Sequence, residues 1–383
     1  MAKPVPSVEN VEMTSSASLA ERLRERIKRE GPVTFRDWME SALYDKREGY
    51  YCRSDRTRWG RTGDYRTSPE RSVLFAATFA GYFAKLYQEL GSPSEWTILE
   101  AGPGTGHFAR GVLETLARSY QIVFAATRYV IDEVSEDARE HLNEFPGKFE
   151  DHLGFSPINQ IQTPIKTGVI FSNELLDAMP VHRVVMRQGN LMELCVSLNE
   201  AEEFVWIETE PTTPQLSAYF STLDIRLDDG QIAEVNLAAG DWLCEAAAKL
   251  ERGYVVTVDY GAEANELYES PQRREGTLRA FERHRFADDV LSNPGSQDIT
   301  TTVNWTHLKQ VAERCGLENV GMERQDRFLI QEGLLYQLSR MTEAADYSAN
   351  AVILRTQARE MILPDGMGAS FQVLVQRRVD SCV

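Results

Sequence analysis

Three glycines at every second position, Gly102, Gly104 and Gly106, follow the acidic residue Glu100 at the end of an apolar segment. Glycine allows a sharp turn and lets a ligand approach the backbone closely, because there is no Cβ in the way. The G-x-G-x-G spacing after an acid favours S-adenosylmethionine over a dinucleotide. A dinucleotide fingerprint needs G-x-G-x-x-G, and His107 occupies the place of its third glycine.

The alternative for this motif is an ordinary tight turn between a strand and a helix. Residues 107–119 then place apolar side chains on one face at helical spacing. Residues 128–134 form a strand-like segment that contains two acids, Asp132 and Glu133. A carboxylate at the tip of the second strand suits the hydroxyls of a ribose. The order of strand, glycine loop, helix, strand and acid therefore indicates a nucleoside-cofactor site.

Composition limits the possible partners. The 383 residues suffice for one large domain or two ordinary ones. A formal net charge of −17 argues against nucleic acid as the main partner, because phosphate binding needs a cationic surface. The five cysteines are scattered without a C-x-x-C pair, which favours a reducing compartment and speaks against structural zinc, so we predict no metal site. The sequence contains no run of 18 apolar residues, so we predict no membrane-spanning helix.

The chain is expected to divide into three parts. Residues 1–17 lack arginine and an apolar segment, so we expect a disordered tail rather than a signal or transit peptide. Residues 18–93 are expected to form a helical cap. Residues 94–383 are expected to form an α/β core with a β-rich insertion at 181–253. We expect a cytoplasmic location, or the mitochondrial matrix if the source is eukaryotic.

Local patterns place the elements within these parts. Ser18 and Glu21 form a capping box that predicts a helix to residue 29, and a second helix begins near Thr34. Ser68-Pro69 is expected to cap a third helix over 70–90. Alternating segments predict short antiparallel strands in the insertion, at 183–186, 191–197 and 204–208. Residues 369–377 alternate and suit an antiparallel edge strand.

Several blocks of sequence together resemble the MidA-like family, which includes the mitochondrial complex I assembly factor with protein-arginine methyltransferase activity. They span about residues 30 to 305 in family order, and the Thr-Ser-Pro-Glu and Asn-Glu-Leu-Leu-Asp-Ala-Met-Pro blocks are the most distinctive. The matching blocks are Gly49-Tyr50-Tyr51, 63–70, 100–106, Glu133-Val134-Ser135, 172–181, Asp259-Tyr260-Gly261, 276–279, Asn293-Pro294-Gly295 and Asp298-Ile299-Thr300.

The resemblance implies a class I, Rossmann-like methyltransferase fold. Such a fold has a seven-stranded, mostly parallel sheet with an antiparallel last strand and helices on both faces. The resemblance also implies S-adenosylmethionine as methyl donor. It does not fix the acceptor, because function depends on the site and not on the fold.

On the donor side, the three glycines would let the backbone approach the amino-acid part of S-adenosylmethionine. Glu100 would contact its ammonium, directly or through water. Glu133 is the candidate for the ribose because it opens the matching Glu-Val-Ser block, and Asp132 would then point to the other face of its strand. Asp151 is expected near the adenine, at the end of the third strand, with a solvated loop acid as the alternative.

A second donor-side group lies in the polar loop before the third helix. Asp64, Thr67 and Ser68 are expected to form part of a lid over the cofactor pocket. The alternative for Ser68 is a simple helix cap.

On the acceptor side, Asn173, Glu174 and Asp177 follow the fourth strand of the core. If the acceptor is an arginine, carboxylates here would pair with its planar guanidinium in bidentate fashion. The alternative is that Glu174 and Asp177 are acids of the first turn of a helix.

A further set, Asp259, Tyr260, Arg279 and His284, is also expected on the acceptor side. His284 could accept a proton, given its ordinary pKa of about 6.5. Its place between Arg283 and Arg285 also fits an ordinary surface residue.

The sequence therefore predicts a methyltransferase that acts on protein arginine. The alternatives are methylation of an oxygen or nitrogen of a small molecule, or a catalytically silent assembly factor. An NAD-dependent oxidoreductase is disfavoured by His107. The expected partner is a protein or small-molecule methyl acceptor, and a homodimer stays open.

Overall fold

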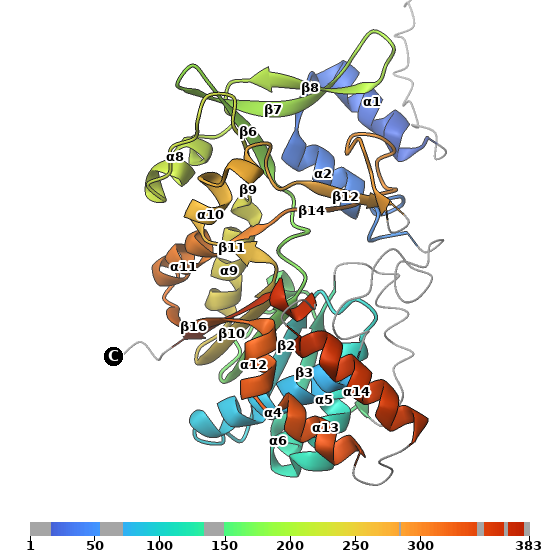
Figure 1. Cartoon of the computed structure of the whole chain (residues 1–383), viewed down its shortest axis with the longest axis vertical. Coiled ribbons are helices and arrows are strands. Elements are labelled where there is room, and N and C mark those ends of the chain that lie inside the picture. Colours follow the sequence, from blue (N-terminus) through green and yellow to red (C-terminus); the bar gives the residue numbers. More distant parts are fainter. Residues whose placement is uncertain are drawn as a thin grey trace, which may run out of the picture.

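The computed structural model describes residues 17–53, 72–133, 149–282, 285–342, 348–363 and 367–378 (Figure 1). Its lower part is built on a seven-stranded sheet in the order β16-β17-β10-β5-β2-β3-β4. The strands are β2 (Trp96–Ala101), β3 (Thr127–Asp132), β4 (Leu153–Phe155), β5 (Gly168–Asn173), β10 (Gly253–Asp259), β16 (Glu318–Arg324) and β17 (Gln372–Arg378).

The predicted class I sheet is confirmed. β17 runs antiparallel to both of its neighbours, whereas the pairs formed by β10, β5, β2, β3 and β4 are parallel. The last strand is not an edge strand, as its alternation had suggested, because β16 covers its outer side. The alternation of β17 therefore reflects two different faces of the sheet and not an exposed edge.

Helices cover both faces of the sheet. One apolar cluster packs α4 (Val73–Glu89), α5 (His107–Ser119) and α6 (Gln121–Ala126) against one face, together with α12 (Gln325–Gln331), α13 (Leu334–Thr342) and α14 (Ala349–Ile362). A second cluster packs α9 (Leu237–Lys249) and α11 (Trp305–Arg314) against the other face. The core is thus a three-layer α/β/α sandwich.

The upper part of Figure 1 combines the N-terminal helices with the β-rich insertion. A five-stranded sheet there consists of β1 (Val33–Thr34), β6 (His182–Arg187), β7 (Asn190–Leu198), β8 (Phe204–Thr209) and β9 (Ile232–Val235). α1 (Leu19–Glu30) and α2 (Phe35–Tyr44) pack on this sheet through an apolar cluster that includes Val33, Val196 and Trp206. The capping box at Ser18 and the three predicted strands are confirmed. α8 (Gln215–Thr222) and α10 (Ala264–Tyr268) complete a further apolar cluster there.

Two expected boundaries differ from the structure. The β-rich insertion ends with β9 and not at residue 253, because α9 packs on the central sheet. The segment 18–93 is not one cap: α1 and α2 join the upper part, whereas α4 packs in the core. α4 begins at Val73 and not at residue 70, and its N-cap is Ser72, whose hydroxyl accepts from the Leu74 amide. The predicted cap, Ser68, lies outside the described residues.

Two small sheets lie between the two parts. One pairs β11 (Gly261–Ala262) with β15 (Val303–Asn304), and the other joins β13 (Arg285–Phe286), β12 (Arg279–Glu282) and β14 (Asp298–Thr300). Short 3₁₀ turns in the described residues are η2 (Ile158–Gln160), η3 (Pro271–Arg273) and η4 (Met367–Ala369). The strands of the two small sheets and η3 belong to the segment that connects β10 to α11.

Cys244 of α9 and Cys315 at the end of α11 form a disulfide, with their Cα atoms 5.3 Å apart. The scattered spacing of the cysteines did not predict this pair, because it depends on the packing of two helices 71 residues apart in sequence. Within the part of the chain that the structure describes, no helix combines the length and apolar character that a membrane crossing needs.

Candidate active site

The chain reverses direction across the sheet between β2 and β5. From β2 it runs outward to β3 and β4, and then it returns to β5 on the other side of β2. Ligands of open α/β sheets bind at such a switch point, outside the carboxyl ends of the strands. The loops that follow β2 and β5 therefore define the place to search for the site, and both carry predicted site residues.

The glycine loop has the backbone that its sequence requires. Gly102, Gly104 and Gly106 have φ angles of 67°, 55° and 74°, in the left-handed region that favours glycine. The amide of Gly102 donates to the Asp132 carbonyl at 3.1 Å, which ties the loop to the end of β3. A Cβ on Gly102 would lie 3.0 Å from Cδ1 of Leu175. The glycine loop and the loop after β5 are thus in contact.

Gly106 also begins α5, as its N-cap, without a capping side chain. The first amides of a helix have no partners within the helix and carry a partial positive charge. They are suited to the carboxylate of an amino-acid moiety. A bare backbone at a switch point beside a helix N-terminus fits the methionine part of S-adenosylmethionine.

Glu100 is buried beneath this loop, with only 4% of its surface exposed. Its Oε2 accepts a 2.6 Å hydrogen bond from the Tyr129 hydroxyl. Burial raises the pKa of Glu100 to about 7, and the Tyr129 hydrogen bond opposes part of that rise. Glu100 thus occupies the core side of the site, where it fixes the start of the loop; its contact with an ammonium stays a prediction.

Glu133 directly follows β3 at the carboxyl edge and is partly exposed. Burial raises the pKa of Tyr44, and the charge of Glu133 adds to the rise after those of Asp177 and Asp298. Asp132 is the last residue of β3 and is 8% exposed. The position of Glu133 at the carboxyl edge, directly after β3, is compatible with its predicted contact with the ribose.

The expectation for Asp151 is wrong. Asp151 is an exposed residue in the turn that precedes β4, whereas it was expected at the end of the third core strand. Since β4 runs parallel to β3, this turn lies at the amino edge of the sheet, opposite the glycine loop. The residue after the carboxyl end of β4 is Ser156, whose amide donates to the Ile131 carbonyl.

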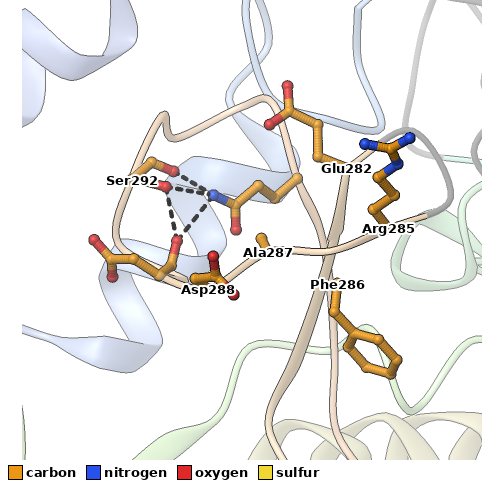
Figure 2. Close-up of a pocket in the computed structure, with 8 residues that line it drawn as sticks. Glu282, Arg285, Phe286, Ala287, Asp288 and Ser292 are labelled. Carbon is orange, nitrogen blue, oxygen red and sulfur yellow. Dashed lines mark hydrogen bonds between the residues drawn. The ribbon is translucent and has the colours of Figure 1, made fainter.

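Four of the predicted site residues, Asp64, Thr67, Ser68 and His284, lie outside the described residues. A cavity of 740 Å³ lies at the β12–β13 hairpin and its following loop (Figure 2). Figure 2 shows hydrogen bonds to Ser292 beside this cavity, and their donor is the side-chain Nε2 of Gln297. The described site residues predicted from the sequence do not line this cavity.

The acceptor-side residues meet at the carboxyl ends of β5 and β10. Asp177 and Asp259 are 2% and 0% exposed. One oxygen of Asp259 accepts from the amides of Leu176 and Asp177, at 2.9 and 3.4 Å, and the other accepts from the Tyr260 amide at 2.9 Å. The two predicted loops thus form one cluster of carboxylates, since Asp259 binds the backbone that carries Asp177.

Glu174 and Asn173 lie beside this pair. Asn173 donates from Nδ2 to Oε1 of Glu174 at 3.1 Å. Glu174 has a φ angle of 52°, which is uncommon for a residue with a side chain. Its amide donates to the Val258 carbonyl at 2.9 Å, which holds this backbone against β10. Strained residues of this kind gather at functional sites.

Ionisation of the carboxyl groups in this cluster is unfavourable. Burial raises the pKa of Asp177 well above its ordinary value, and the charges of Asp259, Glu174 and Asp298 add to the rise. Burial likewise raises the pKa of Asp259 to about 7 against its backbone hydrogen bonds. Among the described residues, neither Asp177 nor Asp259 has an ion pair with a Lys, Arg or His. The cluster is therefore suited to a cationic ligand.

Unsatisfied oxygens point to the same conclusion. Within the described residues, Oδ1 of Asn173 and Oδ1 of Asp177 are buried without a hydrogen-bond partner. Buried polar atoms are normally paired, so each exception needs an explanation. A ligand with several N–H donors would supply both partners. The same residues contain no group of His, Cys, Asp and Glu arranged to hold a metal ion.

Sequence reasoning missed part of the cluster. Tyr44, Tyr51 and Asp298 lie beside the acceptor-side carboxylates: Tyr44 donates from its hydroxyl to the Ala178 carbonyl at 3.1 Å, and Tyr51 donates to Oδ1 of Asp298 at 2.6 Å. The blocks that contain Tyr51 and Asp298 were noted for their resemblance, and this was the available signal. Tyr44 carried no signal of its own.

The comparisons with known proteins agree with this geometry. A family model described as "Putative S-adenosyl-L-methionine-dependent methyltransferase" matches residues 78–323, more than half of the chain. A crystal structure of a Burkholderia thailandensis protein bound to S-adenosyl-homocysteine has a TM-score of 0.83 and 29% sequence identity, and the match covers 94% of this chain and 92% of that one.

Curated relatives match over nearly the whole length. The Drosophila melanogaster protein named "Protein arginine methyltransferase NDUFAF7 homolog, mitochondrial" is 26% identical over 97% of this chain and 89% of its own. The human protein arginine methyltransferase NDUFAF7 is 24% identical over 90% of this chain and 80% of its own. The chain belongs to this family of S-adenosyl-L-methionine-dependent methyltransferases, as its MidA-like motifs indicated.

Proposed function

We propose that this methyltransferase acts on an arginine side chain of a protein. The observation that carries the proposal is the buried pair of carboxylates, Asp177 and Asp259, beside the loop that contacts Gly102. A guanidinium is planar, always charged, and presents several N–H donors that match carboxylate oxygens. The curated relatives are named as protein arginine methyltransferases, which supports the same acceptor.

The chain's own residues would perform three tasks. The glycine loop would bind the amino-acid part of the donor, and Glu133 its ribose. Asp177, with Glu174 and Asn173, would orient one guanidinium nitrogen. Holding two reactants in line contributes up to about 7–11 kcal/mol in well-oriented systems. When bound, S-adenosylmethionine supplies an electrophilic methyl group, which the acceptor nitrogen takes as the carbon–sulfur bond breaks.

The transfer releases one proton, because the protonated arginine becomes a protonated methylarginine. A carboxylate whose pKa lies near the working pH is a suitable proton acceptor. Burial raises the pKa of Asp259 to about 7, which suits it to receive this proton. His284 stays a predicted alternative for the same role.

The rate of methyl transfer should rise with pH across neutrality. Asp259 must be ionised to stabilise the cation, and burial places its pKa at about 7. Arginine itself keeps its charge throughout this range. We therefore expect kcat/KM for the acceptor to increase about tenfold per pH unit below 7 and to level off above it. Initial rates between pH 5.5 and 8.5, with circular dichroism to confirm folding at each pH, measure this. A flat profile would contradict the assignment.

The names of the same relatives also bear on the cellular location of this chain. They are named as mitochondrial proteins, so we propose the mitochondrial matrix for this chain if its source is eukaryotic. The expected cytoplasmic location and the homodimer stay predictions, as does the exclusion of nucleic acid.

The acceptor class can be tested directly. The full chain is incubated with S-adenosylmethionine labelled in its methyl group and a protein extract, and the protein fraction is hydrolysed and analysed for methylated amino acids. We expect labelled methylarginine in the protein fraction, and none with a Gly104→Val control. Label confined to small molecules would overturn the proposal in favour of a small-molecule methyltransferase.

A further inference from the structure

We propose that Tyr44 and Tyr51, supplied by the N-terminal segment, form the aromatic wall of the guanidinium-binding site. The inference rests on the proposed function and extends it: the core supplies the carboxylates and the N-terminal segment supplies the rings that enclose the cation. The N-terminal segment then helps to determine which side chain is methylated.

The hydroxyls of both tyrosines are anchored at the acidic cluster. Tyr44 donates to the carbonyl of Ala178, the residue after Asp177, at 3.1 Å. Tyr51 donates to Oδ1 of Asp298 at 2.6 Å. The ring centroids of the two tyrosines lie 5.4 Å apart with an interplanar angle of 31°. Since Tyr44 is bonded to the loop after β5 and Tyr51 to β14, and the two rings are in contact, the rings form one surface at the acidic cluster.

The charges of acids on both the donor side and the acceptor side act on Tyr44. Asp177, Asp298 and Glu133 all contribute to the raised pKa of Tyr44, after burial as the largest cause. Glu133 is the candidate ribose partner, whereas Asp177 belongs to the acceptor cluster. Together with the hydrogen bond to the residue after Asp177, these charges support a place for the Tyr44 ring beside the acceptor cluster.

The backbone that carries the rings is firmly held. The amide of Tyr51 donates to the Leu43 carbonyl at 2.8 Å, which folds the chain back on the end of α2. Arg22 binds Asp45 at 2.7 Å and Glu48 at 2.9 Å from α1. A wall that is ordered before binding avoids the entropy cost of ordering it on binding.

Three partly exposed tyrosines belong to the segments that contact one another at the acidic cluster. Tyr44, Tyr51 and Tyr260 are each partly exposed, whereas Asp177 and Asp259 are buried. The face of an aromatic ring attracts a cation, by about 0.5–2 kcal/mol, and a planar guanidinium can also stack on it. Carboxylates below and rings beside the ligand therefore favour arginine over lysine, because an ammonium cannot stack.

The test measures binding of a blocked Gly-Arg-Gly peptide to the full chain saturated with S-adenosylhomocysteine. Tyr44→Leu and Tyr51→Leu should each weaken peptide binding by about 3- to 30-fold. Both should leave the affinity for S-adenosylhomocysteine unchanged. Tyr44→Phe and Tyr51→Phe keep the ring and should stay within about 3-fold of the wild type. Calorimetry measures both affinities.

Two controls distinguish the loss of the aromatic ring from a general effect of the substitution on binding. Tyr336→Leu removes an exposed tyrosine of α13, 59% exposed, and should change neither affinity. A Gly-citrulline-Gly peptide, neutral but similar in shape, should bind weakly and should not distinguish the variants. If a Leu variant does not fold, Met at the same position replaces it, since Met adapts to irregular space.

The two proposals fail in different ways. If the wild type forms no methylarginine in protein, the proposed function is wrong. If the wild type forms methylarginine and binds the arginine peptide but the Leu variants bind it equally well, only the aromatic wall is wrong. Phe variants that lose as much affinity as the Leu variants would overturn it as well, because the ring would not be responsible.

Discussion

Replacing Asp177 by Asn should lower methyl transfer at least 100-fold and, at pH 8, raise the melting temperature. Asn keeps the shape of the side chain and removes its charge. Leaving a buried cation without its carboxylate costs about 3–5 kcal/mol, which corresponds to a loss of 100-fold or more. Donor binding should be unchanged, because the glycine loop and Glu133 are not altered.

The gain in stability follows from the direction of the pKa shift. Burial and neighbouring acids raise the pKa of Asp177 in the folded protein. Above the ordinary pKa of about 4, the folded state therefore binds more protons than the unfolded state, and stability falls as pH rises through this window. Asn does not titrate. The difference between variant and wild type should be near zero at pH 4 and grow toward neutral pH.

Thermal unfolding of both proteins between pH 4 and pH 8 measures this difference. Asp151→Asn serves as the matched control, because Asp151 is exposed at the amino edge of the sheet. It should alter neither the melting temperature nor methyl transfer. If Asp177→Asn is destabilised equally at every pH, the loss of a native contact dominates, and burial of the Asp177 charge does not cost the folded protein the stability proposed here.

The strand ends were predictable because apolar runs stop where the sheet stops. Asn173 and Asp259 are the last residues of β5 and β10. Parallel strands bring their carboxyl ends to one edge, so polar residues at those ends meet without any knowledge of the loops. The glycine loop was predictable for a related reason, since its three positive φ angles require glycine.

The proposed aromatic wall was not predictable from the sequence, because it depends on contacts between segments that are distant in the chain. Tyr44 and Ala178 are 134 residues apart, and Tyr51 and Asp298 are 247 apart. No local pattern records that α2 folds over the carboxyl edge. Asp151 was misplaced for a similar reason: the start of β4 could not be fixed from a short segment, and an error of a few residues moved it to the opposite edge of the sheet.

Gly104→Val should abolish donor binding, by at least 100-fold, while the chain stays folded. Gly104 has a φ angle of 55°, where a side chain costs about 1–2 kcal/mol and a β-branched one is a marked outlier. A valine at this position must move the loop out of its conformation or place two methyl groups in the donor site. Both outcomes remove the close backbone approach on which the methionine part of the donor depends.

Calorimetry with S-adenosylmethionine, together with circular dichroism, tests this expectation. Gly321→Val is the matched control: it adds the same side chain in β16, where a Cβ meets nothing within 4 Å. It should leave donor affinity unchanged. A ligand that binds only the folded state raises the melting temperature, so S-adenosylhomocysteine should raise that of the wild type and of Gly321→Val but not that of Gly104→Val. Retained donor affinity in Gly104→Val would mean that the donor does not lie against this loop, and the placement of both subsites around the switch point would have to be revised.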